Sequence, residues 1–390
     1  MENPISTHTS YYNVSIAEWN ARFIKSTTLL LLLMMMVVVV SCGLNDSTDQ
    51  SDRSTSIQDD WLLPIAQIVD GGPGKDGIPS IDRPDFAPVD DVTYVPDSRM
   101  VIGVRIDDDI RAYPHQILDW HEIVNDVVGD TPVSIVYCPL TGTGMCWNRT
   151  IDNEITEFGV SGLLFRNNLI AYDRNTDSNW SQMQLRSVNG PHIERDIETF
   201  QVVETTWETW KKLYPESLVH TTNTGHSRNY SAFTYGSDYA TNHNRILFPV
   251  SNPDSRLQNK DRVHGILGSL TSDGNHRVKV YPIDRFGDGV TLVKDSFDDN
   301  EYLIIGSREH NFAAAFRRVP GSSAASLVFE AVQDELPVIM QDSEGNKWDI
   351  FGRAVAGPRT GEQLTPARSY TGYWFAWADF FPGLLVYQKD

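Results

Sequence analysis

Two stretches of this chain share one spacing of uncommon residues. Residues 190–215 read GPHIERDIETFQVVETTWETWKKLYP, and residues 357–382 read GPRTGEQLTPARSYTGYWFAWADFFP. Both follow the pattern G-P-x15-W-x2-W-x4-P, so the Gly, Pro and Trp positions coincide without a gap. Self-similarity at fixed spacing is the signature of an internal repeat. The sequence therefore predicts a fold built from two related units.

The agreement continues upstream of both stretches. Residues 101–104 (VIGV) and 113–114 (YP) have counterparts at 263–266 (VHGI) and 281–282 (YP). Chance does not explain so many matches in the same order, and together they extend the two units over most of the chain. We therefore predict two tandem, sequence-related subdomains.

Short runs rich in Val, Ile and aromatic residues dominate each predicted subdomain. Residues 100–106, 133–138 and 169–173 have the composition of strands and are bounded by polar turns. Helical periodicity is confined to 114–125 and 206–213, and we expect the apolar stripe of the second stretch to pack in the core. The sequence therefore predicts a β-rich α+β fold with few short helices.

The N-terminus has the parts of an export signal. Arg22 and Lys25 precede residues 29–40 (LLLLLMMMVVVV), an apolar run without a charge. This run is short for a helix that spans a bilayer. The following Ser-Cys-Gly step at Cys42 is typical of a lipobox, in which the cysteine is lipidated and becomes the new N-terminus. We therefore expect an exported lipoprotein, anchored to the cell membrane or the outer membrane and facing the periplasm or the exterior.

A polar segment separates this signal from the folded part. Residues 45–60 (NDSTDQSDRSTSIQDD) have Ile57 as their single apolar residue, so they cannot bury a core and should form a flexible tether. The predicted order is a signal peptide (1–41), a tether (42–60), a lead-in segment (61–98), a first repeat (99–216), a connector rich in Gly, Ser, Asn and Tyr (217–261) and a second repeat (262–390).

The charge balance limits the expected partners. The chain has 52 acidic and 32 basic side chains, which give a formal net charge of -20. A field of this sign repels phosphate backbones, so nucleic acid is excluded from the expected partners. The expected partners are the membrane, through Cys42, and a small-molecule, glycan or peptide ligand.

One segment of the first repeat combines residues that carry chemistry. His121 lies on the apolar face of the helix predicted at 114–125, so its imidazole is expected to point to the interior. Glu122 follows it, and Cys138 ends a predicted strand, just before a loop rich in Thr and Gly. The thiol and the backbone N–H groups of that loop could face a ligand together. We therefore predict a small site centred on Cys138 and His121.

The same segment carries a resemblance to a known family. Residues 112–114, 121–126 and 137–143 resemble a bacterial and archaeal family catalogued only as a domain of unknown function (number 3179). The likeness covers nearly all of the chain after the tether and implies no established activity. Many relatives have a second Cys at the position of Thr141, so the resemblance does not extend to a dithiol redox role here. Further matches lie at residues 71–79, 159–162, 172–174, 206–207 and 374–377.

Alignment of the two repeats assigns the site to the first. A gapless alignment places Ser307 opposite Cys138, and the second repeat has no His-Glu pair near Gly289, where one would fall. The second repeat is expected to adopt the same fold without this cysteine and this His-Glu pair, so the first repeat does not require them for folding. The asymmetry therefore favours a functional role for these side chains.

Three hypotheses for the site stay open at this point. In the first, His121 and Cys138 bind a metal, since imidazole and thiolate suit zinc or copper. In the second, Cys138 is the nucleophile of a hydrolase or transferase, His121 is its base, and Glu122 or Asn125 orients the imidazole. In the third, the protein is a non-catalytic module whose aromatic side chains bind a glycan or a peptide. The sequence does not decide whether the protein is an enzyme.

The cysteines of the first repeat also allow a structural interpretation. Cys138 and Cys146 flank a predicted turn near Gly142 and could form a cross-strand disulfide outside the cytoplasm. His121 would then be a core residue. Additional binding candidates are polar or amphipathic side chains in the matching motifs, namely Asn125, Thr141, Arg149, Asn167 and Trp180.

Overall fold

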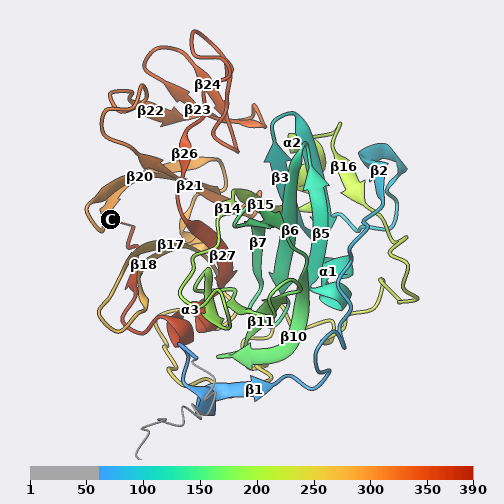
Figure 1. Ribbon diagram of the computed structural model, residues 1–390. Helices are drawn as coiled ribbons and strands as arrows, with labels where there is room; N and C mark the ends of the chain where they lie inside the picture. The colour runs from blue at the N-terminus through green and yellow to red at the C-terminus, as the bar shows by residue number, and fades with distance from the viewer. Residues whose placement is uncertain (1–60, 390) are drawn as a thin grey trace, which may run out of the picture. The chain divides into compact units, whose positions relative to one another are not determined.

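Strands dominate the computed structural model, which describes residues 61–389 (Figure 1). This range contains three α-helices of seven residues each, α1 (His115–His121), α2 (Trp207–Leu213) and α3 (Trp374–Phe380). The prediction of a β-rich fold with few short helices is therefore confirmed. The predicted signal peptide, Cys42 and the tether lie outside the described residues. Within the described range, the helices are too short to traverse a lipid bilayer.

The strands up to His220 form three larger sheets and one hairpin, and the last of these strands lies inside the predicted connector (217–261). In sheet order, the first contains β15 (Val202–Thr206), β3 (Met100–Ile106), β4 (Asp109–Pro114), β16 (Leu218–His220) and β2 (Phe86–Pro88). The second contains β14 (Thr199–Phe200), β7 (Thr143–Asn148), β6 (Thr131–Cys138) and β5 (Ile123–Val128). The third contains β1 (Ile68–Asp70), β10 (Phe158–Phe165), β11 (Asn168–Asp173), β12 (Asn179–Ser181) and β13 (Arg186–Asn189), and the hairpin pairs β8 (Thr150–Ile151) with β9 (Glu154–Ile155).

The strands after the connector form three sheets, drawn in orange and red in Figure 1. The first contains β27 (Ser369–Tyr373), β17 (Arg262–Leu270), β18 (His276–Pro282) and β28 (Leu385–Val386). The second contains β19 (Thr291–Phe297), β20 (Asn300–Ser307), β21 (Phe312–Arg318) and β26 (Thr365–Pro366). The third contains β22 (Phe329–Ala331), β23 (Val338–Asp342), β24 (Lys347–Asp349) and β25 (Ala354–Ala356).

The described chain has two halves, the first ending at His220 and the second beginning at Arg262, and strand pairing is equivalent in both. Strand β3 pairs antiparallel with β4 and β15, and β4 pairs parallel with β16. In the second half, β17 pairs antiparallel with β18 and β27, and β18 pairs parallel with β28. The matched sequence positions therefore fall on strands with matching neighbours. Descent of the two halves from one duplicated unit stays our interpretation of this match.

A close contact between a glycine and a tryptophan explains why both residue types occur at matched positions in the two halves. The indole of Trp210 in α2 lies over Gly103 of β3, where an added Cβ would come within 1.8 Å of the ring. Trp377 of α3 lies over Gly265 of β17 in the same way, at 2.3 Å. Both tryptophans are 0% exposed. Each short helix can therefore bury its indole against the sheet only where the strand has no side chain.

A hydrogen bond between neighbouring sheets also occurs in both halves. The hydroxyl of Tyr113, on β4, donates to Asp126 of β5 at 2.6 Å. The hydroxyl of Tyr281, on β18, donates to Asp295 of β19 at 2.9 Å. Because a buried hydroxyl needs a partner, this pair fixes the tyrosine and aspartate in each half.

The helix predicted at 114–125 is shorter than expected. Helix α1 ends at His121, and Glu122 has a φ of 56°, which takes the chain out of the helix. From Ile123 onward the chain pairs with β6 as strand β5. The β-branched Ile123 and Val124 suit a strand, and pairing with β6 outweighs the local helical spacing. The predicted helical end was therefore wrong by one turn.

Substitution of either contact glycine should destabilise the fold. We expect Gly103→Ala and Gly265→Ala each to lower the free energy of unfolding by about 1–3 kcal/mol or more, because the added methyl group overlaps a buried indole. Denaturant unfolding monitored by tryptophan fluorescence measures this. Gly287→Ala is the control, since its nearest neighbour is the Thr291 hydroxyl at 3.1 Å. Equal stability of all three variants would contradict the packing explanation.

Candidate functional site

Cys138 lies at the end of β6 and is 1% exposed. Its thiol donates a weak hydrogen bond to the backbone carbonyl of Asn167, at 3.7 Å. Burial raises the pKa of the Cys138 thiol to about 11, and the nearby Glu122 carboxyl acts in the same direction. Since the thiolate is the nucleophile and the metal ligand, these surroundings suit a protonated, inert thiol.

Cys146 does not face Cys138. In the β6–β7 pair, Cys138 is opposite Thr143 and Cys146 is opposite Ile135. Cys138 packs in the same hydrophobic cluster as Trp147, whereas Cys146 packs with Ile135 on the other face of the sheet. Both thiols are free, so the proposed disulfide between them is wrong. Side chains alternate between the two faces of a strand, and this alternation places Cys138 and Cys146 on opposite faces of the sheet.

His121 points to the interior, as expected, and both of its ring nitrogens have partners. Nδ1 donates to the backbone carbonyl of Pro79 at 2.8 Å, and Nε2 lies 2.8 Å from the hydroxyl of Tyr230. Burial lowers the pKa of His121 to about 4, so the ring is neutral near pH 7. A carbonyl partner requires Nδ1 to carry the proton, and Nε2 then accepts from Tyr230. Neither nitrogen is left to activate Cys138.

Glu122 diverges from His121 and is also buried. Its carboxyl interacts with the hydroxyl of Tyr235, and burial raises the pKa of Glu122 to about 8. Tyr230 and Tyr235 both belong to the connector. The His-Glu pair therefore contacts the connector at two successive positions, which gives it a structural role in holding that loop.

The additional binding candidates are held in buried hydrogen-bond networks. Asn125 bonds the backbone of Phe158 through both ends of its amide, and Asn167 does the same with Phe248 and Pro249. The remaining three have backbone carbonyl, carboxylate or side-chain partners inside the first half, and they are Thr141, Arg149 and Trp180.

The metal hypothesis has little geometric support. Within residues 61–389, no three His, Cys, Asp or Glu side chains come together in a way that could hold a metal ion. His121 is engaged at both nitrogens, and Cys138 interacts with the carbonyl of Asn167 instead. The structure therefore does not bring the two predicted ligands into one site.

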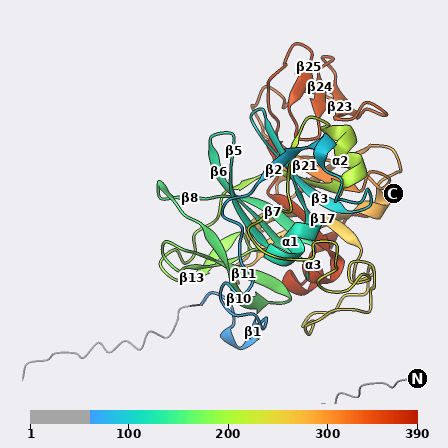
Figure 2. The same ribbon diagram turned by 90° about the vertical axis from the view of Figure 1, so that its right-hand side faces the viewer.

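The connector covers the region where the halves meet. Residues 221–261 contain no helix or strand, and this irregular loop passes α1 and α3 (Figure 2). Tyr239 donates from its hydroxyl to the carbonyl of Leu140 at 2.9 Å, close to the end of β6. Asp379 of α3 accepts from the backbone of Ser251 and Asn252. Long loops without secondary structure that stay ordered are usually functional.

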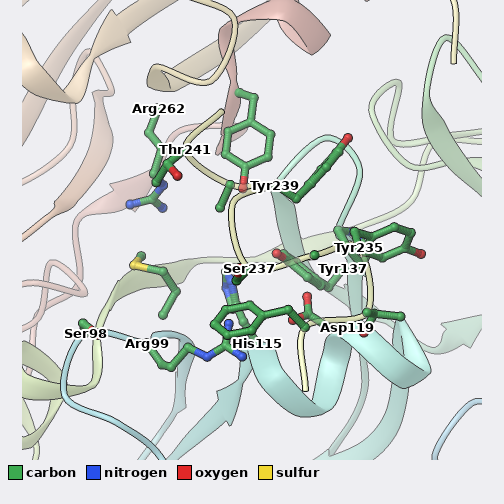
Figure 3. Close-up of a pocket in the computed structure, with 18 of the residues that line it drawn as sticks. Ser98, Arg99, His115, Asp119, Tyr137, Tyr235, Ser237, Tyr239, Thr241 and Arg262 are labelled. Carbon is green, nitrogen blue, oxygen red and sulfur yellow. The ribbon is translucent and has the colours of Figure 1, made fainter. Parts of the chain in front are cut away.

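A pocket of about 350 Å³ lies under this loop (Figure 3). Its walls come from both halves and from the connector. Figure 3 shows His115 and Asp119 on the side of α1 that faces Tyr235 and Ser237 of the connector. The aromatic part of the lining consists of Tyr137, Phe233, Tyr235, Tyr239 and Tyr373, and the charged part consists of Arg99, His115, Asp119, Glu204 and Arg262.

Three of the charged residues form a buried array. Oε2 of Glu204 lies 3.4 Å from Nε2 of His115 and 3.4 Å from a guanidinium nitrogen of Arg262. Oε1 of Glu204 and Nε2 of His115 have no hydrogen-bond partner, although the residues are 3% and 9% exposed. Buried polar atoms without partners are rare in native proteins, and each calls for an explanation such as a ligand.

Asp119 completes the polar side of the pocket. It follows His115 by one helical turn, so the two side chains lie on one face of α1. Burial raises the pKa of Asp119 to about 6, and His115 and Arg99 oppose that rise. A carboxylic acid whose pKa is raised in this way keeps part of its protons in mildly acidic solution and can donate one during a reaction.

Sequence reasoning missed this pocket. The residues of the array belong to β15, α1 and β17, and each is unremarkable in its local context. One signal was present, since the matched repeats have Thr371 and Ile283 where the first half has Glu204 and His115. The two halves therefore also differ at the residues that line this pocket.

The thiols should be unreactive in the folded protein. We expect Cys138 and Cys146 to remain unmodified by iodoacetamide at pH 7.5 and to react fully after unfolding in guanidinium chloride, because burial raises the pKa of both thiols. Peptide mapping by mass spectrometry measures the two positions separately. Rapid native labelling of Cys138, or a mass two protons lower without reductant, would oppose this assignment.

Comparison with known proteins identifies a family but no activity. Neither the curated proteins nor the solved structures include a match to this chain. A family model described as "Protein of unknown function (DUF3179)" matches residues 75–384, a range that contains every residue lining the pocket. The match covers most of the chain and agrees with the resemblance carried by the sequence motifs. The chain therefore belongs to this family, DUF3179, whose function is not known.

Proposed function

We propose that this protein binds a small glycan in the pocket between its two halves, on the outside of the cell. The observation that carries the proposal is the pair of buried polar atoms without partners, Oε1 of Glu204 and Nε2 of His115, at the wall of a cavity. A bound ligand with hydroxyl groups would satisfy both atoms. A cavity of about 350 Å³ is in the range of small-molecule sites.

The lining favours a sugar over a fully apolar or a highly charged ligand. A sugar ring has C–H faces, which pack against aromatic rings, and a rim of hydroxyl groups, which bond to planar polar groups. The pocket supplies tyrosine and phenylalanine rings together with carboxylate and guanidinium groups. Glu204 is paired with Arg262, so these opposite charges largely offset each other. A short peptide is the competing ligand, and the binding test separates the two.

A metal or thiol function receives less support from the geometry. His121 and Glu122 both contact the connector, and Cys138 is buried beside a backbone carbonyl. Their positions are better explained as contacts that hold the loop over the pocket. In this proposal the residues predicted as catalytic act indirectly, through the position of Tyr230 and Tyr235.

Export and lipid attachment remain part of the proposal on sequence grounds. The basic residues, the apolar run at 29–40 and the Ser-Cys-Gly step at Cys42 support a lipoprotein signal. A polar tether at 45–60 would let the folded part reach ligands near the membrane surface.

The lipid anchor has a direct test. We expect the wild-type protein to incorporate labelled palmitate when expressed in a bacterial host, and to partition with the membranes. Cys42→Ser should abolish labelling, because it removes the thiol that receives the lipid. Cys138→Ser is the matched control and should keep the label. Labelling that persists in Cys42→Ser would contradict the proposed anchor.

Ligand binding is tested with a panel of neutral, amino and acidic mono- and disaccharides. At least one sugar should raise the melting temperature of the wild type in a concentration-dependent way. Glu204→Gln should weaken its affinity by about 10-fold or more, because a charge-assisted hydrogen bond contributes about 1.5–3 kcal/mol. Glu208→Gln, an exposed position on α2, is the control and should bind like the wild type.

The same panel contains short peptides as alternatives to sugars. Stabilisation by a peptide and by no sugar would contradict the glycan proposal. The melting temperature of each variant without ligand shows whether a loss of binding reflects a loss of the fold.

A further inference from the structure

The polar side of the pocket contains two groups suited to opposite proton transfers. Asp119 and His115 lie one turn apart on the same face of α1. His115 is 3.4 Å from Glu204, which in turn is 3.4 Å from Arg262. Among the described residues Asp119 forms no ion pair, although His115 and Arg99 act on it at longer range, whereas the imidazole of His115 lies beside a carboxylate. This difference separates a proton donor from a proton acceptor within one cavity.

Cleavage of a sugar acetal needs these two functions. The leaving oxygen is a poor leaving group until it receives a proton, and the attacking water must lose one. A nearby carboxylate also stabilises the positive charge that develops on the sugar ring in the transition state. Burial between aromatic rings strengthens each of these interactions, because it lowers the local dielectric constant.

We propose that the pocket hydrolyses a glycosidic bond, with Asp119 as the general acid and the His115–Glu204 pair as the acceptor of the proton from water. This inference rests on the proposed function, since the same pocket must first bind the sugar. Arg262 is a positioning residue, which holds Glu204 beside the imidazole through their ion pair.

The step is balanced without a cofactor. Asp119 gives its proton to the glycosidic oxygen as the bond from that oxygen to the anomeric carbon breaks. The oxygen of a water molecule forms the new bond to the anomeric carbon, and a proton of that water passes to His115. The products are two hydroxyl compounds, and proton exchange with solvent returns Asp119 and His115 to their starting states.

The surroundings of Asp119 are consistent with the acid role. Burial raises the pKa of Asp119 to about 6, so the group is mostly protonated at pH 5. The titratable groups that interact with it come from its own helix, the segment before β3, the α1–β5 junction, strands β6 and β27, and the connector. They are His115, Arg99, Glu122, Tyr137, Tyr373 and Tyr235.

The experiment compares two leaving groups on the same sugar. For each sugar of the binding panel, the mature chain is assayed from pH 5 to 7 with the methyl glycoside and the 2,4-dinitrophenyl glycoside. Methanol needs a proton to leave, whereas dinitrophenolate does not. We expect Asp119→Asn to lower kcat/KM for the methyl glycoside by about 100-fold or more and to change the dinitrophenyl reaction far less. Glu208→Gln should leave both reactions unchanged.

A second readout needs no variant, so it applies even where Asp119→Asn fails to fold. The wild-type rate on the methyl glycoside should fall as the pH rises through about 6, because Asp119 then loses the proton that it donates. The dinitrophenyl rate should show no fall over that range.

Two results would overturn the proposal. One is the absence of wild-type turnover of any glycoside at every pH from 5 to 7, and the other is an equal loss on both leaving groups in Asp119→Asn. Sugar binding without turnover overturns the catalytic proposal alone and leaves the binding function standing. Absence of both binding and turnover removes the proposed function as well.

Discussion

The pocket depends on the hydrogen bonds that hold the connector against the first half. A loop such as residues 221–261 has no helix or strand to satisfy its backbone, so its position must come from individual contacts. His121 bonds Tyr230, Glu122 bonds Tyr235, and the carbonyl of Leu140 accepts from Tyr239. These contacts place the aromatic side of the pocket opposite α1. Without them, the charged residues below would be open to solvent and would lose the low-dielectric surroundings that raise the pKa of Asp119.

Charge burial is the second constraint on this region. Isolated buried charges are costly, and they persist in proteins when they are paired. Glu204 meets this condition through Arg262 and His115, which come from β17 in the second half and α1 in the first. The ion pair between Glu204 and Arg262 joins the halves at the pocket wall. Oε1 of Glu204 and Nε2 of His115 nevertheless have no hydrogen-bond partner, and in our proposal a bound ligand supplies one.

The residues chosen from the sequence lie close to the pocket, and the structure gives them contacts with the connector. His121 and Glu122 stand at the end of α1, whose opposite end carries His115. The second half lacks this His-Glu pair and contacts the connector through other residues, such as Asp379 of α3. Cys138 was misjudged because a thiol at a strand end before a glycine-rich loop is ambiguous in sequence. Its burial, and the alternation that separates it from Cys146, depend on which face of the β6–β7 pair meets the core.

The sequence by itself determined the β-rich class, the scarcity of helices and the matching positions of the two halves. Strand composition and helical periodicity are local properties of the chain, and the matching positions follow from direct comparison of its two stretches. The tertiary structure alone decided the end of α1, the state of the thiols and the pocket. Glu204 and Arg262 are 58 residues apart, and neither belongs to a motif. They meet because two sheets and an irregular loop pack together, and no local pattern encodes that packing.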